Sequence, residues 1–289
     1  MKFIYRIAFN IIGVTPLSII YFVAKIIGSL LFYLQSSSRR ISALNISLSF
    51  PDLSKTDSHN LLKKSLIESS KGFLENILVW CSPNKANTYF KITVEGLDNI
   101  NESLKLNKGV ILFTPHQGNI EVLINFLSHN FVCSIPFTKI KNSNFNEMIL
   151  EAREEMGVNM VETNFKGIRT LMKAIKKNEV VAIASDQVPN IGGGILSSFF
   201  GRKALSMTLV STLAMKTNSP CHSMVCLREG NKGHFKIIFS SKLEHIGNNL
   251  EEGVNCMNQE LEKCIMNYPE QYAWEYKKYK HSSNIDPYN

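Results

Sequence analysis

The stretch Gly109-Val110-Ile111-Leu112-Phe113-Thr114 is followed without a break by Pro115-His116-Gln117-Gly118-Asn119-Ile120-Glu121. The apolar run predicts a buried β-strand. Gly118 and the good N-cap residue Asn119 predict a tight turn into a helix over residues 120–127. A continuously apolar strand is typical of a parallel sheet that helices cover on both faces. The stretch therefore indicates an α/β fold, with a histidine and a carboxylate where a strand ends.

A second strand of the same character supports this fold class. Residues 166–177 have apolar positions at helical spacing, and residues 179–184 form another continuous apolar run that ends at Ser185-Asp186-Gln187. In sheets of this type, ligands bind beyond the carboxyl ends of the strands. His116 and Asp186 both stand at such ends, which makes them candidates for a functional site.

The rest of the sequence also alternates between predicted helices and strands, as an α/β fold requires. Beyond the N-terminal segment, no linker divides the chain into separate domains. We expect a mixed, largely parallel central sheet flanked by helices. The further predicted elements are helices over residues 57–80, 99–106, 203–216 and 254–265, a strand over 89–94, a mobile loop over 188–195, and an antiparallel hairpin of 221–227 with 234–239.

The N-terminal 40 residues predict a retained hydrophobic membrane anchor. Residues 7–24 contain no charged side chain, and residues 26–34 are again apolar, while a membrane span needs about 20 apolar residues. The anchor would be one tilted helix or two short helices at the surface, and a buried core helix is the alternative. The predicted division is an anchor over 1–40 and a catalytic domain over 41–289.

Composition narrows the class of partner. The 289 residues carry a net charge of +8, which favours anionic partners such as phospholipids or an acidic carrier protein. The sequence has no zinc finger, no aromatic RNA-binding strand and no long basic block, so we expect no nucleic acid partner. Six scattered cysteines without a Cys-x-x-Cys pair indicate reduced thiols. No metal-binding motif is present.

His116 and Glu121 are candidates for proton transfer, because an imidazole can take a proton while a carboxylate fixes its tautomer. Seven His and 24 acidic residues would produce about 0.6 pairs at this spacing by chance. His281 and Asp286 repeat the spacing in a polar tail. The pair can meet only if His116 lies on the strand-end loop and Glu121 in the first helical turn. A helix-capping Glu121 beside an incidental His116 is the alternative.

Asp186 and Arg202 are the other candidates from the residues alone. Arg202 precedes a predicted helix, and both an Arg and free helix N–H groups attract phosphate. Two alternatives remain open: Asp186 caps a loop, and Arg202 is simply exposed to solvent.

An ordered set of motifs carries a family resemblance. His116 to Glu121 looks like the His-x-x-x-x-Asp/Glu motif of acyltransferases, and its order relative to the later motifs resembles the late acyltransferases of lipid A biosynthesis, the lauroyl/myristoyl transferase family of Gram-negative bacteria. The later motifs are Leu171 to Val181, Asp186-Gln187, Phe199-Phe200-Gly201-Arg202, and Pro269 to Trp274 leading into Lys277 to Lys280.

The resemblance implies a glycerolipid-acyltransferase-like fold and a direct acyl transfer without metal or cofactor. The donor would be acyl-acyl carrier protein, and the acceptor a hydroxyl of a Kdo-bearing lipid A precursor. The enzyme would act at the cytoplasmic face of the bacterial inner membrane, in contact with anionic lipid. By the same resemblance His116 would be the general base and Glu121 its orienting partner. Residues expected to bind substrate are Gly118, Asn119, Lys139, Asp186, Gln187 and Arg202.

The chain departs from the family pattern at three places. Thr138-Lys139 stands where relatives often have Arg-Pro, and a Lys supplies charge but no bidentate fork. Val188 stands where many relatives have an acid, and Ile120 replaces a Trp. Two alternatives therefore stay open: an acyltransferase acting on a glycerophospholipid, glycolipid or ornithine lipid, and an inactive protein that binds a membrane or a carrier protein.

Overall fold

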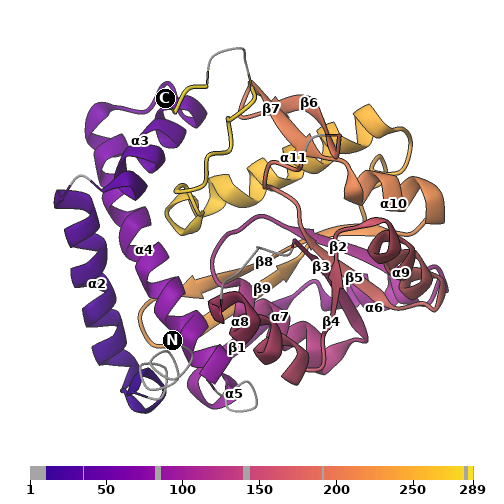
Figure 1. The fold of residues 1–289 in the computed structure, drawn as a ribbon, viewed down its shortest axis with the longest axis horizontal. Coiled ribbons are helices and arrows are strands. Elements are labelled where there is room, and N and C mark those ends of the chain that lie inside the picture. Colours follow the sequence, from indigo (N-terminus) through magenta and orange to yellow (C-terminus); the bar gives the residue numbers. More distant parts are fainter. Residues whose placement is uncertain are drawn as a thin grey trace.

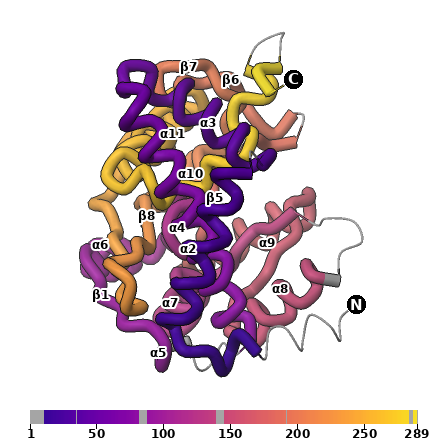
Figure 2. The backbone as a smooth tube through the Cα atoms, turned by 90° about the vertical axis from the view of Figure 1, so that its left-hand side faces the viewer, coloured from indigo at the N-terminus to yellow at the C-terminus, as the bar shows by residue number. Residues whose placement is uncertain are grey.

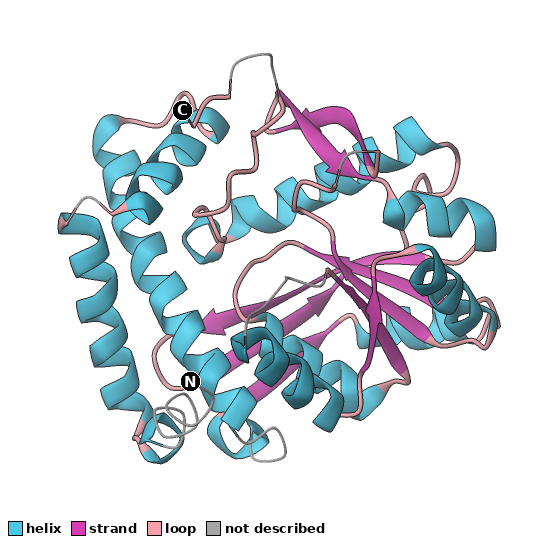
Figure 3. Ribbon diagram, in the orientation of Figure 1, coloured by secondary structure: helices cyan, strands magenta, loops and turns pink. Residues whose placement is uncertain are grey.

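A seven-stranded sheet forms the centre of the protein (Figures 1 and 3). The computed structural model describes residues 11–34, 36–81, 86–138, 144–190, 192–282 and 286–288. The strand order is β1-β9-β8-β2-β5-β3-β4. The strands are β1 (Lys91–Glu95), β2 (Val110–Thr114), β3 (Cys133–Phe137), β4 (Asn159–Glu162), β5 (Val180–Ala184), β8 (Cys221–Glu229) and β9 (His234–Phe239).

Strand direction confirms the predicted mixed, largely parallel sheet. Every neighbouring pair in the order is parallel except β8 and β9, which form the predicted antiparallel hairpin. All five residues of β2 are buried, as its uninterrupted apolar sequence predicted. Strands β3 and β4 were not predicted, because their short segments carry a weak periodic signal.

Helices cover both faces of the sheet. Leu112 of β2 belongs to one apolar cluster with helices α4, α6 and α7, whereas Phe113 belongs to a second cluster with α9, α10 and α11. Successive strand residues point to opposite faces, so the two clusters lie on the two sides of the sheet. The helices are α4 (Lys55–Cys81), α5 (Ala86–Tyr89), α6 (Leu97–Leu104), α7 (Ile120–Asn130), α8 (Asn144–Glu155), α9 (Phe165–Lys176), α10 (Leu209–Thr217) and α11 (Leu250–Asn267), with a 3₁₀ turn at Pro269–Gln271.

The predicted helix over residues 203–216 is wrong in its first half. Residues Arg202–Met207 form strand β7, which pairs antiparallel with β6 (Gly194–Phe199), and helix α10 begins only at Leu209. Burial alternates along β7, and the buried Ser206 Oγ accepts a hydrogen bond of 2.8 Å from Asn258 of α11. A period of two, and not of 3.6, therefore governs this segment. The loop predicted over 188–195 is shorter than expected at its end, since strand β6 of this hairpin begins at Gly194.

The N-terminal helices α2 (Leu17–Tyr33) and α3 (Ser37–Ser49) pack against α4, and the tube view shows α2 running along α4 (Figure 2). Within the described ranges, no single helix is long and apolar enough to cross a membrane; α2 and α3 reach that length and composition only as a bent pair. The predicted division between residues 40 and 41 falls inside α3.

The contact between α2 and α4 depends on Gly28. A Cβ at this position would lie 2.5 Å from Ile67 Cα and 2.7 Å from the Leu66 carbonyl oxygen, which are backbone atoms of α4. Only a residue without a side chain lets the two helices approach this closely.

We predict that Gly28→Ala destabilises the protein although alanine favours helix. The helix-propensity gain is about 1 kcal/mol, whereas overpacking against a rigid backbone costs about 1–3 kcal/mol. Denaturant unfolding should show a lower midpoint for Gly28→Ala, and Ser29→Ala on the same helix serves as the control. A midpoint for Gly28→Ala at or above the wild-type value would contradict the close contact.

Candidate active site

The register between β2 and β5 brings His116 and Asp186 together. The two strands are parallel neighbours, and Thr114 at the end of β2 lies opposite Ala184 at the end of β5. The Ser185 amide continues the pairing with a 3.0 Å hydrogen bond to the Thr114 carbonyl. His116 and Asp186 each follow two residues after a paired position. Because neighbouring strands lie about 4.8 Å apart, their side chains meet beyond the same edge of the sheet.

Two hydrogen bonds fix the pair. Nδ1 of His116 lies 2.6 Å from Asp186 Oδ1, and the His116 backbone amide donates to Oδ2 at 3.0 Å. The Asp186 side chain is only 3% exposed, whereas that of His116 is 32% exposed. With a carboxylate at Nδ1, the imidazole proton is placed on Nδ1 and the lone pair on Nε2.

The electrostatics of the pair favour a charged imidazole. Burial alone would lower the pKa of His116, but the adjacent Asp186 carboxylate outweighs it and raises that pKa above its usual value. Burial would raise the pKa of Asp186, yet the His116 imidazole and the hydrogen bonds hold it below the usual range. Asp186 is therefore an anion that stabilises the protonated imidazole.

Lys278 is a second cation near Asp186. Its side chain is buried, and its Nζ has no hydrogen-bond partner within the described part of the chain. The ammonium lies 4.7 Å from the centre of the Phe199 ring. Burial lowers the pKa of Lys278 to about 8 against the opposing effect of Asp186. The charge of this lysine favours the ionised form of Asp186.

The predicted contact between Glu121 and His116 is wrong, because Asp186 occupies the Nδ1 position. Glu121 lies in the first turn of α7 as expected, but its carboxylate pairs with Arg153 of α8 through bonds of 2.5 and 3.1 Å. The Glu121 side chain is 3% exposed and that of Arg153 is 20% exposed. A buried carboxylate takes the nearest guanidinium because its charge needs a partner. Sequence reasoning missed Arg153, since α8 itself was not predicted.

A cavity of about 950 Å³ opens beside His116 and Arg153. Gln187 also lines it, and its Nε2 lies 3.4 Å from His116 Nε2, the nitrogen that Asp186 leaves free. The cavity wall is formed mostly by apolar side chains of α7, α8, β3, β5 and β8, among them Leu123, Ile124, Leu127, Ile135, Leu150, Ala182 and Met224.

Gly118 and Asn119 do not line this cavity and instead shape the loop that carries His116. Gly118 has φ +66°, and a Cβ there would lie 1.8 Å from the Cys226 carbonyl oxygen, so the predicted requirement for glycine is confirmed. Asn119 caps α7 as predicted: its Oδ1 accepts a 2.9 Å hydrogen bond from the Val122 amide.

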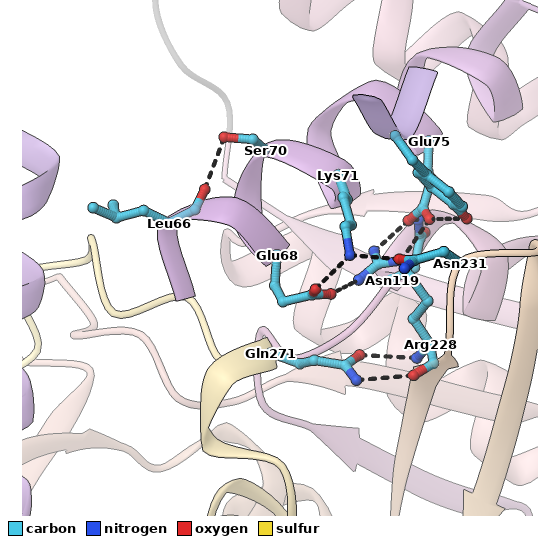
Figure 4. Close-up of polar contacts among 10 residues, drawn as sticks. Leu66, Glu68, Ser70, Lys71, Glu75, Asn119, Arg228, Asn231 and Gln271 are labelled. Atoms are coloured by element: carbon cyan, nitrogen blue, oxygen red, sulfur yellow. Dashed lines mark hydrogen bonds and ion pairs between the residues drawn. The ribbon is translucent and has the colours of Figure 1, made fainter. Parts of the chain in front are cut away.

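A buried polar network holds this loop against α4 and β8 (Figure 4). Asn119 donates its amide to Glu75 Oε2 at 3.0 Å, and Glu75 forms two hydrogen bonds with the Arg228 guanidinium. Arg228 also pairs with Glu68, which accepts a 2.7 Å bond from Lys71. Glu75 and Arg228 are almost completely buried, so each charge has its compensation inside the network.

The C-terminal segment closes the loop from the other side. Gln271 binds both backbone groups of Arg228, at 2.8 and 3.0 Å, and its carbonyl accepts from the Gly118 amide at 2.8 Å. The Ala273 amide donates to the His116 carbonyl at 3.0 Å. The motif around Gln271 thus positions the histidine loop.

Arg202 and Lys139 are the two remaining residues that the sequence predicted to bind substrate. Arg202 begins strand β7 and donates Nε to the Leu48 carbonyl at 2.8 Å; it is not among the cavity residues. The expected anion site at a helix N-terminus is absent there because no helix follows. Lys139 lies outside the described residues. Among those described, no group of three His, Cys, Asp or Glu side chains is placed to hold a metal ion.

Comparison with known proteins finds one matching family and several similar proteins. The model of the family described as bacterial lipid A biosynthesis acyltransferase matches residues 1–281. The Escherichia coli (strain K12) proteins named lipid A biosynthesis palmitoleoyltransferase and lipid A biosynthesis lauroyltransferase are each 22% identical over 269 residues, covering 92% of this chain and 86% of their own. A lipid A biosynthesis acyltransferase of Haemophilus influenzae is 21% identical over 183 residues, covering 62% of this chain and 56% of its own.

We predict that Asp186→Asn lowers the pKa of His116. The substitution removes the carboxylate that raises this pKa most, while burial and the Arg153 charge, which lower it, remain against the smaller opposing effect of Glu121. The value should fall below the ordinary one of about 6.5, as read from an NMR titration of the imidazole. Asp286→Asn is the control, and an unchanged His116 titration in Asp186→Asn would refute the assignment of the pair.

A double-substitution cycle tests the network of Figure 4. Arg228→Met should lower the free energy of unfolding by about 3–5 kcal/mol, because it leaves Glu75 buried without a cation. Glu75→Met combined with Arg228→Met removes both charges and should regain part of that loss. Glu102→Gln breaks an exposed pair with Lys105 and should change stability by less than about 1 kcal/mol. A double variant no more stable than Arg228→Met would contradict the charge argument.

Proposed function

Because the chain belongs to the bacterial lipid A biosynthesis acyltransferase family, it is an acyltransferase, and we propose that it moves a fatty acyl group from acyl-acyl carrier protein to a hydroxyl of a lipid A precursor. The observation that carries the proposal is the His116–Asp186 pair at the wall of a large, mostly apolar cavity. The pair supplies a base, and the cavity supplies room for an acyl chain.

The cavity has the size and lining that a fatty acyl group requires. Its 950 Å³ lies at the upper end of the range of about 300–1,000 Å³ found for ligand sites. Aliphatic side chains from α7, α8 and the sheet line it, so a hydrocarbon chain bound there would bury much of its apolar surface. The thioester end of the chain would then lie near His116.

His116 is the proposed general base. Its Nε2 takes the proton of the acceptor hydroxyl as the hydroxyl oxygen attacks the thioester carbonyl carbon. The new C–O bond forms, the C–S bond breaks, and the imidazolium returns the proton to the departing thiolate. Asp186 holds the tautomer and stabilises the imidazolium during this exchange, which is the part that the sequence assigned to Glu121.

Arg153 is the proposed electrostatic partner of the reaction. Glu121 uses the Nε and one Nη of the guanidinium, which leaves further N–H donors on a side chain that lines the cavity. A fixed cation at the reacting group stabilises the negative charge that develops on the carbonyl oxygen or a phosphate of the substrate. In this role Glu121 is a positioning residue for Arg153.

The outward face of α2 is the proposed membrane contact, at the cytoplasmic face of the inner membrane. Ile20 and Ala24 are buried against the protein, whereas large apolar side chains on the other side of α2 are exposed. Such a face suits the boundary between head groups and acyl chains, and nearby lysines suit anionic lipid. The exposed residues are Ile19, Phe22, Val23, Ile26, Leu30 and Tyr33.

We predict that a strain whose only copy carries His116→Ala makes lipid A that lacks one acyl chain. Loss of a general base lowers turnover by about 10²- to 10⁴-fold, and mass spectrometry of the lipids reports the missing chain. His281→Ala is the matched control and should give wild-type lipid A. An acyl chain missing from another lipid instead would replace the proposed acceptor, and a normal lipid profile in the His116→Ala strain would reject the base.

A further inference from the structure

Helix α9 presents a continuous basic face to solvent. Lys166, Arg169, Lys173 and Lys176 follow one another at spacings of three and four residues, and Lys177 comes directly after the helix. Residues at these spacings share one face of a helix. All five side chains are exposed, while Leu171, Ala174 and Ile175 on the other side are buried. We call these five residues the α9 basic face.

The fold itself does not require this charge. Helix α9 contains no acidic residue, and none of the five cations has an ion-pair partner among the described residues. Like charges three and four residues apart destabilise a helix. A charge pattern that costs stability and has no internal partner fits an anionic partner outside the chain.

The α9 basic face begins at the rim of the cavity. Glu162 and Thr163 line the cavity, and Asn164 caps α9 by accepting a 2.9 Å hydrogen bond from the Gly167 amide. The next residue, Phe165, is 70% exposed, and the Arg169 guanidinium lies 4.3 Å from the centre of its ring. An exposed aromatic ring stacked with an Arg is the composition typical of an interface anchor.

We infer that the α9 basic face, with Phe165, is the docking surface for an acidic carrier protein that delivers the acyl thioester; the inference rests on the proposed acyl transfer. A carrier bound there would hold its thioester arm beside the cavity rim. Helices α2 and α9 lie at opposite ends of the molecule (Figure 1). A bilayer that contacts the apolar face of α2 would therefore leave α9 in water, which favours a soluble partner over lipid head groups.

The test compares two thioester donors with one acyl chain. Lauroyl-acyl carrier protein presents the chain on an acidic protein, and lauroyl-pantetheine presents it without one. The variant K166Q/R169Q/K173Q should raise KM for the carrier donor by about tenfold or more, while kcat/KM for lauroyl-pantetheine stays at the wild-type value. Affinity for the carrier protein is measured in parallel by titration calorimetry and should fall by the same factor.

A charge-matched control is K91Q/K242Q/K263Q, which removes three exposed lysines outside α9 and outside the cavity lining. This variant should behave as wild type with both donors. Equal KM for the carrier donor in the α9 variant and the control would overturn the inference. So would a loss of binding to phosphatidylglycerol vesicles with carrier affinity unchanged, since that result assigns the α9 basic face to lipid.

The proposed function can fail separately from the docking surface. If the wild-type protein transfers neither a lauroyl nor a palmitoleoyl chain from acyl carrier protein, the acyl-carrier reaction is rejected, and calorimetry alone decides the surface. Carrier binding that the wild type shows and K166Q/R169Q/K173Q loses would support the docking surface, and no binding to the wild type would overturn it.

Discussion

The ion pair between Glu75 and Arg228 is the contact on which the arrangement of the site depends. It joins helix α4 to strand β8 across 153 residues of sequence, and both side chains are almost fully buried. Asn119 ties the start of α7 to Glu75, and Gln271 ties the C-terminal segment to the backbone of Arg228. Four parts of the chain that are distant in sequence therefore meet at one pair of charges (Figure 4), and Asn119 connects this pair to the loop that carries His116.

Burying these charges costs a large desolvation energy, and apolar residues of equal volume often hold a core together as well. The charges instead select one geometry. A guanidinium accepts a carboxylate as a planar fork, and the second carboxylate, Glu68, together with Lys71 makes the group of four charges neutral. Because Gly118 touches the Cys226 carbonyl and Asn119 is bound at both its cap and its amide, the loop has little freedom. His116 is consequently held beyond the end of β2, next to Asp186, which follows the end of β5.

Local chemistry predicted the parts of the site that depend on nearby residues. The apolar run of β2, the glycine turn at Gly118, the cap at Asn119 and the acid at the end of β5 all follow from neighbouring sequence. The partner of His116 depends instead on which strands are neighbours, and the order β2-β5-β3 arises from packing between distant segments. Arg153 lies on helix α8, which was not predicted from the sequence, so the guanidinium that Glu121 binds was missed and Glu121 was assigned to His116. The strand at Arg202–Met207 was misread because a six-residue alternation beside a helix is short compared with the window that periodicity needs.

The proposed mechanism includes a competing reaction, because an imidazole that activates a hydroxyl beside a thioester can also activate water. Three features of the site bear on this competition. The aliphatic part of the cavity wall offers few partners for ordered water, whereas Gln187 and Arg153 are polar groups that line the cavity with His116. The Gln187 amide lies 3.4 Å from Nε2, the nitrogen proposed to accept the proton, so in that proposal an acceptor hydroxyl replaces this contact before transfer begins. The raised pKa of His116 leaves a larger share of the imidazole protonated at neutral pH, which slows activation of water and of an acceptor hydroxyl alike. In the proposed mechanism the pair thus stabilises the imidazolium of the transfer step, at the cost of fewer molecules that hold a free base at neutral pH.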